Sequence, residues 1–294
     1  MAVFNKIILY IQIRGILALL GMKEHVLWAG LPTPAILLKI LRPIKVVYYY
    51  QDLYTAYYEE LAFSSVIKND QLLFSAANEV ICASRGMYNE KKMLKKNVRY
   101  IPHGVDQAFL NFDIIKQYGV PVALAQIPKP ILGYWGTLEM LQDQTIIDYC
   151  ATKHPEWSFV FIGNPVGDLS MMKNHPNVYF LGYKPLKEIP FYGIHFDVCL
   201  MNFVQTEWIK YSCPVKLREY LALGKAIVSV PIIEVEEAFP GVAGIARTPQ
   251  EFCAMCEKEM VSDSKEKRMY RRNLITNYSW EHTADLVFEI LKAN

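Results

Sequence analysis

A lysine and a glutamate three residues apart are the polar residues of this chain best placed to do chemistry. Lys216 and Glu219 lie in the run YSCPVKLREYLALGKAIVSV. Pro214 favours the start of a helix just before them, Gly224 its end, and residues 226–230 a short buried strand. Residues three apart share a helix face, and the free N–H groups of a helix start favour an anion. The pair could therefore bind a phosphate and a sugar hydroxyl, although the same spacing also gives ordinary surface ion pairs worth only about 0.2–0.5 kcal/mol.

Strands that alternate with helical segments predict the scaffold around this helix. Runs such as KVVYYY at 45–50 and FDVCLM at 196–201 are typical of buried parallel strands. We therefore predict an α/β protein with two Rossmann-like doubly wound domains. The expected parts are an N-terminal domain over residues 1–115, a linker rich in glycine and proline over 116–130, a C-terminal domain over 131–275 and a C-terminal helix over 276–294. Only 44 residues precede KVVYYY and they supply one convincing strand, so the N-terminal domain is expected to be shortened.

The residues that follow each strand of the second domain are expected to surround one crevice, because ligands bind at the carboxyl ends of strands in open parallel sheets. These residues are 133–137, which include Thr137, and the pairs Gly163-Asn164, Gly182-Tyr183 and Asn202-Phe203. Gly133 and Gly136 lack a Cβ and would let the backbone approach a diphosphate closely. Taken alone, G-x-x-G also occurs in ordinary turns.

Four blocks resemble segments of known enzymes: GYWGTL at 133–138, NVYFLGY at 177–183, FDVCLMNF at 196–203 and PVKLREYLALGKAIVS at 214–229. They resemble glycosyltransferases with the GT-B fold, above all family four and related bacterial polysaccharide (glucuronosyltransferase-like) enzymes. The resemblance implies that Lys216 meets the donor diphosphate and Glu219 holds the nucleotide ribose. It also implies that the loop 133–136 lies beside the diphosphate and that Tyr183 contacts the uracil base, with core packing as the alternative for this tyrosine.

The same resemblance suggests residues for the acceptor side. YYYQDLYTAY is similar to a family segment in which an aromatic strand ends in an acid, and it assigns Asp52 as the base that takes a proton from the acceptor hydroxyl. A helix N-cap is the alternative for Asp52. His103, in IPHGVD, matches a family turn that lines the cleft, and is otherwise a surface or backbone-bonded histidine. The family pattern E-x7-E has Tyr211 in place of its first carboxylate, so sugar recognition is expected to differ there, with the aromatic segment 203–211 as a candidate.

Composition and charge narrow the class of protein. A formal charge of +2 does not indicate a nucleic-acid partner. The basic runs at 91–96 and 265–272 are expected to be solvated helix faces, or alternatively to contact anionic lipid. The apolar run 7–20 is interrupted by Gln12 and Arg14 and is shorter than the roughly 20 residues of a membrane span, and no signal-peptide cleavage site follows it. We expect a cytoplasmic protein, with peripheral contact at the inner face of an anionic membrane left open.

The six cysteines have no framework spacing and are expected to be free thiols in a reducing compartment. Cys253 and Cys256 form a lone C-x-x-C on a helical pattern, and the two further ligands that zinc needs do not follow at metal spacing. No metal site and no cofactor are therefore expected.

The resemblance, taken with these patterns, implies a metal-independent glycosyltransferase of the GT-B type that transfers a hexosyl or uronosyl group. It would move a sugar from a nucleotide-sugar donor, expected to be UDP-linked, to a glycan or lipid-linked acceptor in surface polysaccharide biosynthesis. A non-catalytic GT-B module acting as a partner or regulatory subunit is the main alternative, and a nucleotide-sugar epimerase is another. A dinucleotide-binding dehydrogenase is disfavoured, since no G-x-G-x-x-G follows a strand.

Overall fold

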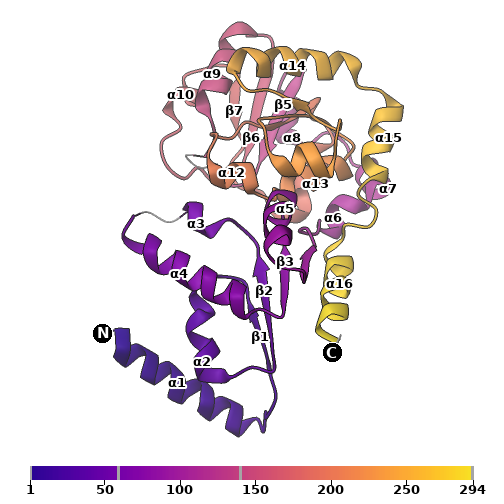
Figure 1. Ribbon diagram of the computed structural model, residues 1–294. Helices are drawn as coiled ribbons and strands as arrows, with labels where there is room; N and C mark the ends of the chain where they lie inside the picture. Colours follow the sequence, from indigo (N-terminus) through magenta and orange to yellow (C-terminus); the bar gives the residue numbers. More distant parts are fainter. Residues whose placement is uncertain (1, 58–59, 139–140, 293–294) are drawn as a thin grey trace. The chain divides into compact units, whose positions relative to one another are not determined.

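The computed structural model describes residues 2–57, 60–138 and 141–292 and divides into two compact units, Met1–Pro102 and His103–Asn294 (Figure 1). Each unit has its own sheet, and every strand pairing in both sheets is parallel. The predicted α/β class with two Rossmann-like sheets is therefore confirmed.

The first unit has four described strands in the order β1-β2-β3-β4. They are β1 (Val26–Ala29), β2 (Lys45–Tyr50), β3 (Glu79–Cys82) and β4 (Val98–Tyr100). Its helices are α1 (Ala2–Leu19), η1 (Thr33–Ile36), α2 (Leu37–Leu41), α3 (Tyr54–Tyr57), α4 (Glu60–Ala76) and α5 (Arg85–Leu94). Helix α4 packs on η1 and β2, and α5 packs on β3 and β4. Within the described residues, strand order follows the chain, as in one half of a doubly wound sheet.

The basic run 91–96 is tied into the first unit. The Lys95 ammonium donates to the carbonyl oxygens of Phe74 at 2.8 Å and Ser75 at 3.3 Å and also to that of Ala77. These carbonyls end α4, where the helix dipole favours a cation. The Lys91 ammonium lies 4.9 Å from the centre of the Tyr50 ring. Lys95 therefore departs from the predicted solvated face, because it caps a helix.

The second unit has six described strands in the order β10-β9-β8-β5-β6-β7. They are β5 (Ile131–Trp135), β6 (Ser158–Ile162), β7 (Val178–Phe180), β8 (Val198–Met201), β9 (Ala226–Ser229) and β10 (Gly244–Ile245). The helices are α6 (Gln107–Leu110), α7 (Phe112–Ile115), α8 (Val122–Ala125), α9 (Gln144–Lys153), α10 (Ser170–Lys173), η2 (Leu186–Glu188), α11 (Ile189–Gly193), α12 (Glu207–Tyr211), α13 (Val215–Ala222), η3 (Glu234–Ala238), α14 (Pro249–Ser262), α15 (Lys265–Asn273) and α16 (Trp280–Lys292). The strand order reverses between β5 and β8, which makes this edge the topological switch point of the sheet.

The core of the second unit is built on its central strands. All described side chains of β5, β6, β8 and β9 are buried, and α14 packs against α9 and β9. Cys253 and Cys256 of α14 are fully buried, and the six cysteines are free and pack as small apolar side chains, as predicted. The described residues contain no group of three or more His, Cys, Asp or Glu that could hold a metal ion.

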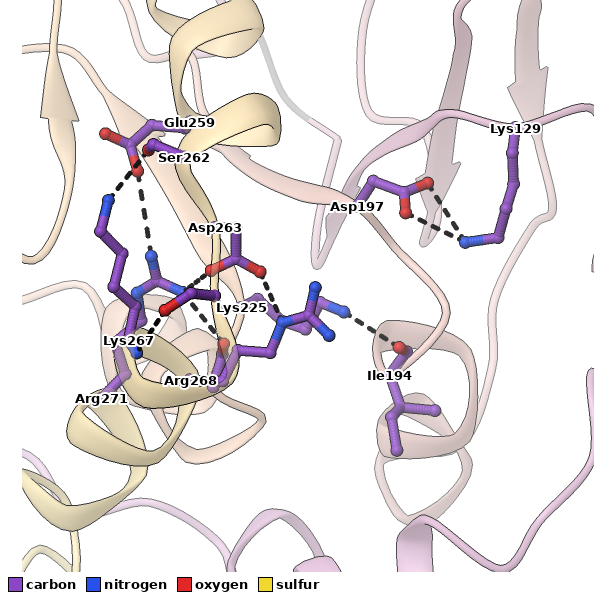
Figure 2. Close-up of polar contacts among 12 residues, drawn as sticks. Lys129, Ile194, Asp197, Lys225, Glu259, Ser262, Asp263, Lys267, Arg268 and Arg271 are labelled. Carbon is purple, nitrogen blue, oxygen red and sulfur yellow. Dashed lines mark hydrogen bonds and ion pairs between the residues drawn. The ribbon is translucent and has the colours of Figure 1, made fainter.

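An ion pair and a hydrogen bond fasten the amino ends of β5, β8 and β9 (Figure 2). Lys129, before β5, pairs with Asp197, before β8, at 3.0 Å. Lys225 lies just before β9 and donates to the carbonyl oxygen of Ile194 at 3.0 Å. Burial lowers the pKa of this lysine to about 8.

Part of the second basic run is also internal. The carboxylate of Asp263 accepts from Arg268 and Arg271, both at 2.6 Å, in the cluster that Figure 2 shows. Arg271 is only 3% exposed and also donates to the carbonyl oxygen of Gly224 at 3.1 Å. Arg271 therefore departs from the predicted solvated face, because it holds the end of α13 to the turn between α14 and α15.

The C-terminal helix predicted from residue 276 begins at Trp280 in the structure. Residues 274–279 are held apart from the helix because Val105 pairs with Ser279, and the Val105 amide donates to the carbonyl oxygen of Tyr278 at 2.7 Å. None of the described helices combines the length and apolar character that a membrane crossing requires.

Candidate functional site

A pocket of about 380 Å³ opens at the carboxyl ends of β5, β6 and β7, beside the start of α13. It is lined by Trp135, Gly136, Thr137, Ile162, Gly163, Asn164, Tyr183, Lys184, Leu186, Ile189, Lys216 and Glu219. Its size suits a small-molecule ligand, and its place next to a topological switch point is where open parallel sheets bind ligands. Eight of these residues were expected at the crevice or in the site: Trp135, Gly136, Thr137, Gly163, Asn164, Tyr183, Lys216 and Glu219.

Backbone hydrogen bonds hold the three strand ends close together. The Gly136 amide donates to the carbonyl oxygen of Ile162 at 2.9 Å, and the Gly163 amide donates to that of Gly182 at 3.0 Å. Gly136 has φ 132° and Gly163 has φ 148°, a region that favours glycine. A Cβ on Gly163 would overlap the carbonyl oxygen of Gly136, so this close backbone approach requires glycine.

Lys216 lies across Gly136. The residue belongs to the first turn of α13, and its ammonium lies 5.2 Å from the centre of the Tyr134 ring. A Cβ on Gly136 would overlap Cε of Lys216 and stand 2.5 Å from its Nζ. Gly136 therefore makes room for the lysine, which gives the pocket a cation beside the free N–H groups of a helix start.

Glu219 is buried beneath the same pocket, with 7% of its surface exposed. Its Oε2 accepts a hydrogen bond from the indole Nε1 of Trp135 at 2.6 Å. Burial raises the pKa of Glu219, while the Lys216 charge and the Trp135 hydrogen bond lower it and the Asp106 charge raises it. A solvated surface pair, the alternative for Lys216 and Glu219, does not fit a carboxylate buried in this way.

Tyr183 and Thr137 stand at the rim. The Tyr183 side chain is 64% exposed, which excludes the core packing considered as its alternative. Thr137 is exposed, and its carbonyl oxygen accepts from the Tyr134 hydroxyl at 3.3 Å. Both positions leave side chains available to a bound molecule.

Three other predicted residues lie outside the pocket lining. Gly133 is buried in β5, where a Cβ would overlap the ring of Phe196, so packing requires this glycine. His103 packs against Trp280 with ring centroids 5.9 Å apart, and burial, with Arg218 as a smaller cause, lowers its pKa to about 4. Asp52 belongs to the first unit, half-buried between β2 and α3.

The expected pair Asn202-Phe203 does not line the pocket either. The Asn202 carbonyl oxygen accepts from the Asp143 amide at 2.7 Å and Phe203 is 7% exposed against Tyr134, so both residues fasten the loop before α9.

The sequence reasoning missed several lining residues, of which Lys184 matters most. Lys184 follows Tyr183 directly, and its ammonium lies 5.9 Å from the centre of the Tyr192 ring. A second lysine just after a strand end was a usable signal for an anion site. Trp135 lies within the expected range 133–137, but its indole donor was not singled out, since an apolar residue at the end of a buried strand normally only packs.

A buried ion pair supports the start of α13 from below. Arg218 and Glu234 are fully buried and form an ion pair, and Arg218 donates to the Cys213 sulfur at 3.2 Å. The Arg218 guanidinium also lies 5.4 Å from the ring centres of Phe239 and Tyr278. This cluster joins η3 and the segment before α16 to the helix that carries Lys216 and Glu219.

No family model matches the chain. It is 27% identical over 230 residues to TuaH of Bacillus subtilis (strain 168), named provisionally as a teichuronic acid biosynthesis glycosyltransferase, and the match covers 73% of this chain and 57% of TuaH. The chain thus spans little more than half the length of this relative.

Solved structures share the fold at low identity. Anabaena HepE in complex with UDP and glucose has a TM-score of 0.71 at 15% identity, over 92% of this chain and 78% of HepE. A glycosyltransferase from Rickettsia africae has a TM-score of 0.68 at 13% identity, over 97% of this chain and 81% of that one. The UDP-forming trehalose-phosphate synthase of Burkholderia vietnamiensis has a TM-score of 0.68 at 13% identity, over 97% of this chain and 76% of the synthase. The two parallel sheets and these similarities show that the chain has the GT-B glycosyltransferase fold.

Proposed function

We propose that the chain is a glycosyltransferase that takes a sugar from a nucleotide donor, UDP-linked, at the pocket between β5, β7 and α13. The observation that carries the proposal is one cation and one buried carboxylate, Lys216 and Glu219, side by side at the switch point of the second sheet. The cation suits a diphosphate and the carboxylate suits a ribose hydroxyl. The UDP in the HepE complexes, which share the fold, supports the choice of nucleotide.

The pocket would stabilise the departing nucleoside diphosphate without a metal ion. As the glycosidic bond breaks, negative charge develops on the diphosphate, where Lys216 and the first N–H groups of α13 supply fixed positive potential. Lys184, which also lines the pocket, adds a second cation. Metal independence is part of this proposal, because fixed donors take the part that a bound ion plays elsewhere.

For the acceptor side, we propose a glycan or lipid-linked acceptor in surface polysaccharide biosynthesis, with Asp52 as general base. The provisional assignment of TuaH to teichuronic acid biosynthesis supports the product class. Asp52 would accept the proton of the attacking hydroxyl as the new bond forms at the anomeric carbon. The transferred group would be a hexosyl or uronosyl unit.

Calorimetric titration with UDP tests the donor site. Lys216→Ala and Glu219→Ala should each weaken binding by roughly ten- to a hundredfold, the loss of one hydrogen bond to a charged group. Lys265→Ala is the matched control, since that lysine is exposed at the start of α15, and should bind like wild type. Wild-type affinity in both pocket variants would refute the site assignment.

Turnover separates the enzyme from a non-catalytic nucleotide-sugar-binding module. Wild type incubated with a panel of UDP-sugars and lipid-linked acceptors should convert the donor to free UDP. Asp52→Asn should bind UDP with normal affinity but form UDP from the donor far more slowly. Donor binding with no UDP release by wild type would instead assign a binding or regulatory role.

Membrane contact, if the acceptor is lipid-linked, is proposed for α1 as well as for the exposed lysines of the basic runs. Ile11 and Leu19 of this helix are 62% and 86% exposed, whereas Lys95 and Arg271 are engaged inside their units. Co-sedimentation with vesicles containing anionic lipid should fall in Ile11→Asp and Leu19→Asp. Unchanged co-sedimentation would exclude α1 as the contact.

A further inference from the structure

The hydrogen bond between Trp135 and Glu219 links two elements that build the pocket. Trp135 is the last residue of β5 and is 3% exposed, and its indole Nε1 reaches Glu219 Oε2 on α13 at 2.6 Å. This is short for an N–H donor and fits a charge-assisted bond to a carboxylate. The bond therefore fixes one oxygen of a side chain that otherwise has three rotatable bonds.

The indole itself has no freedom to turn. Its ring meets Tyr220 edge-on with centroids 4.5 Å apart, and Phe109 and Phe196 lie at 6.0 and 5.9 Å. On a further side, a Cβ on Gly193 would stand 2.8 Å from the far edge of the indole. The N–H direction is thus set by core packing, independent of any ligand.

One oxygen of Glu219 is left for a ligand. Among the described residues Oε2 has the Trp135 donor, and no hydrogen bond to Oε1 is formed, while the residue lines the pocket. A carboxylate can accept several hydrogen bonds, so Oε1 keeps full capacity for a hydroxyl donor.

The groups facing Glu219 determine whether it stays ionised. Lys216 on α13 and Trp135 on β5 lower its pKa, against burial and the Asp106 carboxylate before α6, which raise it. Cys199 on β8 and Tyr220 on α13 also face it, and burial raises the pKa of both, so both are neutral. Only one cation and one neutral donor therefore favour the charged form.

We propose that Trp135 is a positioning residue for donor binding, whose indole N–H holds one oxygen of Glu219 and keeps the other ready to accept from a hydroxyl of the nucleotide sugar. This inference rests on the proposed function of the pocket. Trp135 does not itself need to touch the donor, since it acts through the carboxylate.

A double-mutant cycle with UDP as ligand tests the proposal. Trp135→Phe keeps an aromatic ring and removes the N–H, and should weaken binding roughly three- to tenfold. On a Glu219→Ala background the same change should cost almost nothing, because the acceptor side chain through which it acts is gone. Trp157→Phe is the matched control, a buried tryptophan of the same unit that is outside the pocket lining, and should bind like wild type.

The pH dependence of binding on the acid side distinguishes a positioning role of Trp135 from a merely structural one, which would leave this pH dependence unchanged. Glu219 must be ionised, so affinity falls as the pH drops through its pKa, and Trp135→Phe removes a contribution that lowers that pKa. The midpoint of the Glu219 Cδ titration, followed by carbon NMR in the ligand-free protein, should therefore lie at higher pH in Trp135→Phe.

The outcomes separate this inference from the function on which it rests. Wild type that fails to bind UDP overturns the proposed donor site and the role of Trp135 with it. Wild type that binds UDP, with additive losses in the cycle or an unmoved Glu219 midpoint, overturns the role of Trp135 alone.

Discussion

Replacing Gly136 by alanine tests whether this glycine is needed to make room for Lys216. A Cβ there would overlap Cε of the lysine and stand 2.5 Å from Nζ, while ordinary contacts begin near 3.4 Å. The lysine end is flexible, so it would move by about 1 Å rather than force the backbone apart. The position also has φ 132°, which alanine tolerates poorly.

Two separate costs follow, and they have different sizes. The strained backbone should lower stability by roughly 1–3 kcal/mol, a fall in melting temperature of roughly 2–12 °C for a domain of this class. Displacing the ammonium should remove part or all of a charge-assisted contact to the diphosphate, worth roughly 1.5–3 kcal/mol, so UDP affinity should fall by up to roughly a hundredfold.

Two comparisons separate strain from displacement. Gly241 has φ 77° and open space around a built Cβ, so Gly241→Ala should lose stability and keep UDP affinity. On a Lys216→Ala background, Gly136→Ala should lower stability again but cost no further affinity. Thermal unfolding and calorimetry on the same samples measure both quantities. An affinity loss of equal size with and without Lys216 would refute the argument.

Three further predictions concern the stability of the two units and are tested by denaturant unfolding. Arg218→Ala should cost roughly 3–5 kcal/mol, because it leaves the buried Glu234 charge unpaired, while Arg218→Met with Glu234→Leu should recover most of that loss. Burial lowers the pKa of His103 to about 4, below the usual value near 6.5, so the folded protein favours the neutral ring. The free energy of unfolding should therefore fall by at most roughly 3 kcal/mol as the pH drops from about 6.5 to about 4. His103→Gln should flatten this fall, and an unchanged slope would contradict the burial of the ring. Lys95→Ala should cost roughly 1–2 kcal/mol through the lost cap of α4, while its exposed neighbour in Lys96→Ala should change little; equal effects would refute the capping role.

The sequence predicted the parts of the site that follow from local chain physics. Pro214 and Gly224 mark the ends of α13, and the apolar run after them forms β9, as expected from their backbone preferences. The strand ends that carry Gly136, Gly163 and Tyr183 were also found, because the carboxyl ends of parallel strands meet at one edge.

The rest depended on partners far along the chain. Gly133 has the same residue type as Gly136, but only the packed Phe196 ring shows that it serves the core. From the sequence alone, Arg218 resembles an ordinary surface cation of a helix. The structure shows that it is buried and paired with Glu234. Burial of a charged side chain is decided by such tertiary partners, which no local pattern encodes.

The site thus consists of a backbone frame and side chains attached to it. The frame is set by close approach, since Gly136 and Gly163 meet where a Cβ on Gly163 would overlap a carbonyl oxygen. Two side chains lie at the rim of this frame: Lys184 is half-buried and Tyr183 is exposed. Changes at the rim can therefore alter which ligand is favoured with little cost to folding, whereas a side chain at Gly163 must open the strand ends themselves. The fold is shared with HepE at only 15% identity. This fits a site whose backbone frame fixes the residue type at few positions and leaves the attached side chains free to vary.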